Sequence, residues 1–218
     1  MNQRIGIIGV GKLGSALGRL ALDAGLDLSV ADDPANPHVG LVVASILPGA
    51  RFTDATDLLA TSDIIILAVP QPVLATLPLD AAAGVLVDAT NAWEATDGVR
   101  AGTGPTTPAL LAAHPHLRLV KTFNQYAYAD LLPDARPAGA PGRRAMAVAG
   151  DDQVAVGAVA RLVDALGFDP VVVGMDAAEL LEPSGPVFGR KLTAPDLVAV
   201  VTAHAPERLA GRPTPRRG

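Results

Sequence analysis

The sequence predicts an α/β fold, with a doubly wound and mostly parallel sheet followed by a short helical extension. Short apolar runs alternate with stretches of helical periodicity along most of the chain. Runs such as "DIIILAV" and "GVLVDA" are continuously apolar, which is typical of strands buried on both faces of a parallel sheet. At the start of the chain, the apolar run Arg4–Ile8 leads directly into a glycine-rich turn, and a strand followed by such a turn also favours this fold class.

Eight segments have the composition of strands, and the segments between several of them have the period of helices. The predicted strands are Arg4–Ile8, Asp27–Ala31, Ala50–Thr53, Asp63–Val69, Gly84–Asp88, Leu117–Thr122, Arg144–Ala149 and Phe168–Val173. Residues 91–109 and 133–143 are rich in Gly, Pro and Thr, so we expect them to be loops at the ends of the sheet.

Two helices are predicted with defined ends. The apolar stripe between residues 13 and 24 ends at Gly25, a residue that commonly terminates helices. A second helix is expected over roughly residues 151–166, with Asp151 or Asp152 as its N-cap.

The chain is predicted to have three parts. Residues 1–174 form a dinucleotide-binding domain, and residues 175–205 form a helical extension. Within the extension, Thr193 has the position of an N-cap, and Asp196 completes a capping box three residues later. Residues 206–218 are expected to be a solvated, disordered tail.

Composition excludes several classes of function. Half of the residues are hydrophobic and only 18% are charged, so we expect a globular protein. The absence of cysteine excludes disulfides, thiolate metal ligands and a cysteine nucleophile. The net charge of −5, with no basic run before the tail, argues against nucleic-acid binding. No leader segment or long apolar run is apparent, so we expect a cytoplasmic protein that does not insert into membranes.

The segment "IGIIGVGKLGSALG" has the spacing of a dinucleotide-binding fingerprint. Gly9 would form the tight turn, Gly11 would let a pyrophosphate approach the backbone, and Gly14 would let the helix pack closely on the strand. The N–H groups of Lys12, Leu13 and Gly14 would then point at the phosphates. A glycine turn without a ligand is the alternative, but the strand before it and the amphipathic helix after it favour binding.

Asp32 lies 23 residues after Gly9, close to the spacing at which an acidic residue usually binds the adenosine ribose. A carboxylate at this position accepts hydrogen bonds from the ribose hydroxyls of NAD and repels the 2′-phosphate of NADP. Asp33 adds a second negative charge, and no Arg or Lys follows until Arg51. Asp33 is also a residue type that caps turns, and for this residue we favour that role.

Three further segments follow predicted strands at the same edge of the sheet, namely "LAVPQP" (67–72), "DATNAW" (88–93) and "VKTFNQ" (120–125). With the fingerprint, and with "AAELLEPSGPVFG" near the C-terminus, they resemble the NADP oxidoreductases that use the deazaflavin coenzyme F420. Metalloreductases and pyrroline-5-carboxylate reductases share parts of the pattern. The resemblance runs in order from residue 4 to about residue 189.

The resemblance implies how the nicotinamide half of the cofactor and the second substrate would bind. The backbone of Ala68, Val69 and Pro70 would pass beside the nicotinamide ribose. Residues near Glu182–Phe188 would form the far wall of the site, where the second substrate enters.

The resemblance also implies roles for residues that follow two neighbouring strands. Asn91 and Asn124 would offer their amides to the ribose or the carboxamide, and the region of Phe123 would help to close the pocket. Each asparagine taken alone could equally be a turn-forming residue. Their joint placement favours a functional role.

The chain departs from its likely relatives after the second strand. The NADP-specific members of the family have a hydroxyl residue and an arginine there, and this chain has Asp32 and Asp33. The expected cofactor is therefore NAD or NADP, with NAD favoured.

No acid/base or metal-binding constellation is apparent in the sequence. The four histidines, which lack the spacing of metal ligands, are His38, His114, His116 and His204. Lys121 follows a buried strand, and we interpret it as a lysine whose ammonium reaches solvent at the strand end.

Hydride transfer between two carrier coenzymes requires mainly proximity and orientation, because the cofactors supply the chemistry. We therefore expect an NAD(P)-dependent oxidoreductase that passes a hydride to a flavin-like or deazaflavin acceptor, with coenzyme F420 as one candidate. The alternatives are reduction of an imine or a ketone by way of Lys191 or a tyrosine of "NQYAYADL", and a sensor of NADH without catalysis. The exposed "EPSGPVFG" segment also favours a homodimer.

Overall fold

The computed structural model describes residues 3–33, 35, 37–94, 98 and 102–204. Eight strands in this part of the chain form one sheet, and they are β1 (Arg4–Ile8), β2 (Asp27–Ala31), β3 (Arg51–Phe52), β4 (Ile64–Leu67), β5 (Val85–Asp88), β6 (Arg118–Lys121), β7 (Ala145–Ala149) and β8 (Asp169–Val173). The tail predicted at residues 206–218 lies outside the described residues.

The strand order is β3-β2-β1-β4-β5-β6-β7-β8. Strands β1 to β6 are parallel, whereas β7 is antiparallel to β6 and β8 is parallel to β7. The predicted doubly wound, mostly parallel sheet is therefore confirmed. The chain order reverses direction between β1 and β4, and in such sheets ligands bind beyond the carboxyl ends of the strands at this point.

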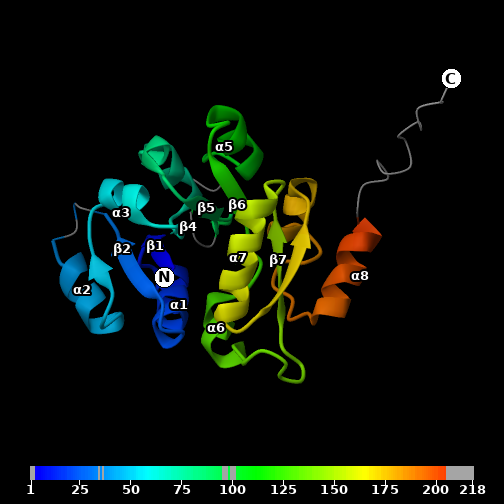
Figure 1. The fold of residues 1–218 in the computed structure, drawn as a ribbon. Coiled ribbons are helices and arrows are strands. Elements are labelled where there is room, and N and C mark those ends of the chain that lie inside the picture. The colour runs from blue at the N-terminus through cyan, green and yellow to red at the C-terminus, as the bar shows by residue number, and fades with distance from the viewer. Residues whose placement is uncertain (1–2, 34, 36, 95–97, 99–101, 205–218) are drawn as a thin grey trace.

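Helices cover both faces of the sheet (Figure 1). One buried apolar cluster contains residues of α1 (Lys12–Asp23), α2 (Val39–Ile46), α6 (Tyr128–Asp134) and α7 (Gln153–Ala165). The opposite cluster contains residues of α3 (Ala55–Thr61), the 3₁₀ helices η1 (Gln71–Thr76) and η2 (Leu79–Ala81), and α5 (Thr107–Ala113). Burial on both faces explains why a central strand such as β4 (Ile-Ile-Ile-Leu) is apolar without interruption.

The C-terminal segment forms the 3₁₀ helix η4 (Met175–Leu181) and helix α8 (Ala194–His204). Leu181 and Leu197 pack against Ala147 and Val171, so this segment shares a core with β7 and β8. In Figure 1, α8 stands beside these two strands at one end of the sheet. No helix in the described part of the chain is long and apolar enough to cross a membrane.

One of the two aspartates predicted as the N-cap of the second helix has this role in the structure. Asp152 caps α7, because its carboxylate accepts from the backbone N–H groups of Val154 and Ala155. The other candidate, Asp151, instead accepts from Met175 N at the start of η4.

The two residues of the capping box predicted for α8 are paired: the hydroxyl of Thr193 donates to the carboxylate of Asp196 over 2.6 Å, and the backbone of Thr193 also binds this carboxylate. The two predicted loops are shorter than expected. Helix α5 begins within the first at Thr107, and α6 extends into the second as far as Asp134.

Candidate functional site

The glycine-rich turn joins β1 to α1 at the carboxyl edge of the sheet. Gly9 has a φ of +98°, and a Cβ on it would lie 2.5 Å from the carbonyl oxygen of Ala68. A Cβ on Gly14 would collide with the carbonyl oxygen of Gly9, so helix and strand pack too closely for a side chain there. The turn and packing roles expected for these two glycines are thus present in the structure.

Gly11 differs from both neighbours in the fingerprint. Its φ of −70° suits any residue, and a Cβ on it would have no heavy atom of the described residues within 4 Å. Gly11 is the N-cap of α1, where several residue types serve, so neither strain nor packing requires glycine at this position. The open space before the N-terminus of α1, where Lys12 and Leu13 begin the helix, is the place that the fingerprint assigns to a pyrophosphate.

Asp32 lies at the carboxyl end of β2, beside this turn. Its Oδ2 accepts a hydrogen bond from Val10 N over 2.6 Å, and its Oδ1 accepts from Asp33 N over 2.7 Å. Asp33 is exposed and accepts from Ala35 N over 2.9 Å, which is the turn-capping role that we favoured for it. Arg51, the next basic residue, donates to Ser29 further back along β2.

Ala68, Val69 and Pro70 follow β4 at the same edge, next to the glycine turn. Ala68 N donates to the carbonyl of Ile8 over 2.8 Å, so the end of β4 is tied to the end of β1. Ala68 and Val69 are half-buried and Pro70 is exposed. Their backbone is therefore accessible at the predicted place.

Asn91 and Asn124, which follow β5 and β6, are hydrogen-bonded to each other. The amide of Asn91 donates to the carbonyl of Asn124 over 2.9 Å, and the amide of Asn124 donates to Asn91 Oδ1 over 3.0 Å. Asn124 also donates to Leu181 O, and its own Oδ1 is buried without a partner among the described residues. The joint placement expected from the sequence is present.

Phe123 occupies a different place from the one expected. It has a φ of +67°, an uncommon conformation for a bulky residue, and its ring is fully buried in the main apolar core. It therefore shapes the turn that carries Asn124 and does not line the pocket described below. Strained backbone of this kind is found preferentially at functional sites.

Lys121, at the end of β6, is fully buried, and our interpretation of it as a solvent-reaching lysine was wrong. Its ammonium lies 2.8 Å from Glu182 Oε1 and 3.3 Å from Asp88 Oδ2, and it donates to Thr90 O over 2.7 Å. An ammonium has three N–H donors, so these contacts use all of them. The sequence reasoning missed this cluster, whose members lie up to 94 positions apart, from Asp88 to Glu182.

The carboxylate of Asp88 also has all of its hydrogen-bonding positions occupied. One of its oxygens accepts from the backbone N–H and the hydroxyl of Thr90, and the other accepts from Thr107 and Lys121. Together with Glu182, the group has two carboxylates and one ammonium, so it carries a net negative charge at the carboxyl ends of β5 and β6. Polar residues directly after strands at this edge were the signal that could have indicated it.

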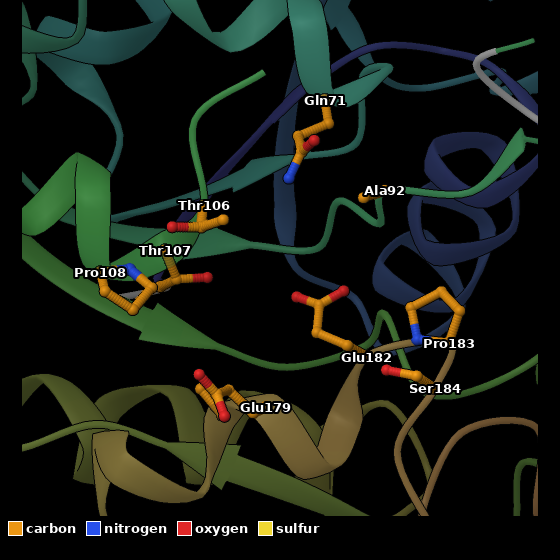
Figure 2. A pocket seen from close by; sticks show the side chains of 10 residues that line it. Gln71, Ala92, Thr106, Thr107, Pro108, Glu179, Glu182, Pro183 and Ser184 are labelled. Atoms are coloured by element: carbon orange, nitrogen blue, oxygen red, sulfur yellow. The ribbon is translucent and has the colours of Figure 1, made fainter. Parts of the chain in front are cut away.

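A cavity of about 300 Å³ adjoins this cluster (Figure 2). It is lined by Gln71, Ala92, Thr106, Thr107, Pro108, Ala178, Glu179, Glu182, Pro183 and Ser184. The carboxylate of Glu182 points into the middle of this space, and the amide of Gln71 points toward it from the opposite wall. The far wall expected near Glu182–Phe188 thus contributes Glu182 and the two residues after it.

Lys191 and the tyrosines of "NQYAYADL" lie outside the residues that line this cavity. Lys191 pairs with Asp130 and Asp134 of α6 over 2.7 and 2.8 Å, and these carboxylates raise the pKa of its ammonium. The hydroxyl of Tyr126 donates to Asp134, and burial, with this hydrogen bond, raises the pKa of Tyr126. Lys191 thus fastens the C-terminal segment to α6.

Tyr128 lies under the ammonium of Lys12, which is 5.3 Å from the centre of its ring. This contact links α6 to the first residue of α1. Among the residues that the structure describes, no three His, Cys, Asp or Glu side chains are grouped as metal ligands would be.

Comparison with known proteins supports a redox function. Residues 4–92 match the family "NADP oxidoreductase, coenzyme F420-dependent". No protein of curated function matches the sequence. The matched segment contains the fingerprint, Asp32, Ala68–Pro70 and Asn91.

Solved structures share the fold over most of the chain. A hypothetical protein from Sinorhizobium meliloti is 26% identical, with a TM-score of 0.70 over 88% of this chain and 96% of its own. A protein from Arthrobacter sp. FB24, described as an F420-dependent NADP reductase, is 22% identical, with a TM-score of 0.64 over 81% and 88% of the two chains. An imine reductase from Myxococcus stipitatus is 20% identical, with a TM-score of 0.59 over 82% of this chain and 56% of its own.

The family match at the cofactor-binding end and the shared Rossmann-like fold confirm the resemblance seen in the sequence. The chain is similar to the NADP oxidoreductases that depend on coenzyme F420, and it is an NAD(P)-dependent oxidoreductase.

Proposed function

We propose that this protein transfers a hydride between NADH, in preference to NADPH, and a flavin-like or deazaflavin acceptor. The observation that carries the proposal is the open space at Gly11. Neither its backbone conformation nor its packing requires glycine, whereas a pyrophosphate at the N-terminus of α1 does.

The residues around this space fit a dinucleotide. The N–H groups at the start of α1, from Lys12 onward, would hold the pyrophosphate. Asp32 would hold the adenosine ribose, because a carboxylate oxygen can accept a second hydrogen bond besides the one from Val10 N. Ala68–Pro70 and Asn91 would lie beside the nicotinamide half.

The preference for NADH follows from charge. A 2′-phosphate at the end of β2 would meet the carboxylates of Asp32 and Asp33. Arg51 is committed to Ser29 and lines a separate cavity with Arg4 and Asp27, at the amino ends of β1 and β2. Arg51 is therefore not placed to neutralise a phosphate at Asp32, as an arginine in NADP-binding sites usually does.

Bound NADH would supply the hydride, and the chain would hold the two reacting rings in contact and away from water. The cavity beside Asn91 and Ala92 offers room for the acceptor. The family match supports a deazaflavin such as coenzyme F420 as that acceptor, and flavins have a similar ring system.

A second candidate is reduction of an imine. The Glu182 carboxylate faces the cavity and could pair with a protonated C=N group. The likeness in fold to imine reductases is compatible with this activity.

Stopped-flow mixing of the protein with NADH or NADPH and then with coenzyme F420, FMN or a cyclic imine separates these candidates. We expect NADH to be oxidised above background with F420 or FMN. Oxidation with the imine alone would favour the second candidate. Tight binding of NADH without turnover of any acceptor would contradict both and favour a sensor.

A further inference from the structure

Two polar side chains of the cavity wall have buried oxygens without a partner among the residues that the structure describes. They are Gln71 Oε1 and Glu182 Oε2. A buried polar atom without a hydrogen bond destabilises a protein, so such atoms are uncommon unless a ligand or water satisfies them. These two belong to opposite walls of one cavity (Figure 2).

Glu182 is held in place by one oxygen only. Its Oε1 is bound by Lys121, whose remaining N–H groups are taken by Asp88 and Thr90. Lys121 therefore has no donor left for Oε2, or for a ligand. The geometry leaves Glu182 Oε2 as a fixed hydrogen-bond acceptor beside the cavity.

Gln71 provides the complementary group. It is only 3% exposed, and no hydrogen bond of its side chain is found with the described residues. Figure 2 shows its amide nitrogen pointing across the open space toward Glu182. The cavity thus presents an amide donor on one side and a carboxylate acceptor on the other. Of the two unpartnered oxygens, only Glu182 Oε2 would be satisfied by a ligand held in this way, since Gln71 takes part through its nitrogen.

Resting on the function proposed above, we propose that Gln71 and Glu182 bind the imide edge of the acceptor ring, C(=O)–NH–C(=O). Glu182 Oε2 accepts from the ring N–H, and the amide of Gln71 donates to a flanking carbonyl. Oxidised flavins and deazaflavins share this edge, in which one N–H lies between two carbonyl groups.

The carboxylates of the cavity wall also disfavour another class of substrate, small anionic acids. The carboxylate of a small 2-oxoacid would meet Glu182 and Glu179 in the cavity, and Lys121 is not free to neutralise it. The cavity therefore selects an acceptor that donates a hydrogen bond over one that is an anion at its binding edge.

Binding of lumiflavin and of 3-methyllumiflavin tests the proposal, because the methyl group replaces only the imide hydrogen. Affinities are measured by flavin fluorescence with the protein saturated by NAD⁺. We expect the wild type to bind lumiflavin about 10-fold or more tightly than its methyl derivative, as for other hydrogen bonds to a charged group. Equal affinities, or no binding of lumiflavin, would overturn the proposal.

The variant Glu182→Gln keeps an oxygen for Lys121 but can present N–H to the ring. We expect its preference for lumiflavin to fall to about threefold or less, with Glu179→Gln retaining the larger ratio. If Glu182→Gln and Glu179→Gln lowered the preference for lumiflavin equally, the negative charge of the cavity and not a hydrogen bond would explain the preference, and the proposal would be overturned.

Energy transfer to NADH from Trp93, the only tryptophan of the chain and next to Ala92 of the cavity wall, reports whether each variant is folded and binds cofactor. The wild-type protein could bind lumiflavin more tightly than its methyl derivative and yet reduce neither lumiflavin nor F420. This result would contradict the proposed function but still support the imide-binding site.

Discussion

Asp32 Oδ2 accepts a hydrogen bond from Val10 N over 2.6 Å, so the carboxylate at the end of β2 is fixed against the glycine-rich turn. One residue thus stabilises the turn that would hold the pyrophosphate and also lies where the ribose would bind. A change at this position affects both the stability of the turn and the choice of cofactor.

The double variant Asp32→Ser with Asp33→Arg should narrow or reverse the preference for NADH. It removes the repulsion of a 2′-phosphate and adds a guanidinium that binds one well. Affinities for NADH and NADPH, measured by calorimetry, give the ratio. The melting temperature must be recorded in parallel, because the contact with Val10 N is altered as well.

Asp33→Ala is the matched control for this pair. Asp33 is exposed and caps a turn, so its charge should contribute less than that of Asp32, and the variant should keep most of the preference for NADH. A full loss of preference in Asp33→Ala alone would contradict the assignment of the ribose to Asp32.

Gly11→Ala should weaken NADH binding by about 10-fold or more, because the added methyl would occupy the space meant for the pyrophosphate. Gly11 is the N-cap of α1, where alanine is less favourable than glycine, so stability should fall by no more than about 1 kcal/mol. Gly157→Ala on α7 is the control, since a Cβ there would make only an ordinary van der Waals contact, 3.7 Å from the Arg161 guanidinium. It should stabilise the helix by up to about 1 kcal/mol and leave binding unchanged. Equal NADH affinity in both variants would show that the space at Gly11 has no ligand.

Lys121→Met should lower the free energy of unfolding by about 3–5 kcal/mol, because it leaves Asp88 buried without its cation. Lys191→Met removes an ammonium that is partly exposed, so it should cost much less stability than Lys121→Met and retain turnover. Urea denaturation and steady-state rates of the two variants provide the comparison. A larger loss of turnover in Lys191→Met would restore Lys191 as a catalytic candidate.

The parts of the site that could be predicted from the sequence depend either on local spacing or on the shared edge of neighbouring strands. The roles of Gly9 and Gly14 follow from a strand, a turn and a helix within about a dozen residues, and local spacing fixes them. Asn91 and Asn124 were predicted together because parallel neighbouring strands end at one edge.

The buried cluster could not be predicted in this way. Lys121 and Glu182 are brought together by β7, α7 and β8, which lie between them in the chain. The sequence contains no signal that the chain after β8 comes back to the end of β6. A lysine at a strand end reaches solvent more often than it is buried, so the ordinary expectation failed. The left-handed conformation of Phe123 has no local signature either.

The stability of α7 should depend on pH through Asp152. The Arg118 guanidinium and the backbone N–H of Ala155 lower the pKa of Asp152 to about 2. A carboxyl whose pKa is lowered on folding contributes stability above its unfolded pKa of about 4, and this contribution is lost as the pH falls toward 2.

Asp152→Asn retains a good helix cap but has no charge. Its free energy of unfolding should therefore fall below that of the wild type near pH 6 and approach it near pH 2.5, as measured by urea denaturation at about these two values. A constant difference between the two proteins would contradict this dependence on ionisation.

Calorimetric titration of the wild-type protein with NADH and NADPH, side by side at one ionic strength, tests the central claim most directly. The open cradle at Gly11 and the carboxylates of Asp32 and Asp33 predict that both dinucleotides bind at one site and that NADH binds more tightly. Tighter binding of NADPH would contradict the role given to these aspartates, and the absence of binding by either would contradict the function itself.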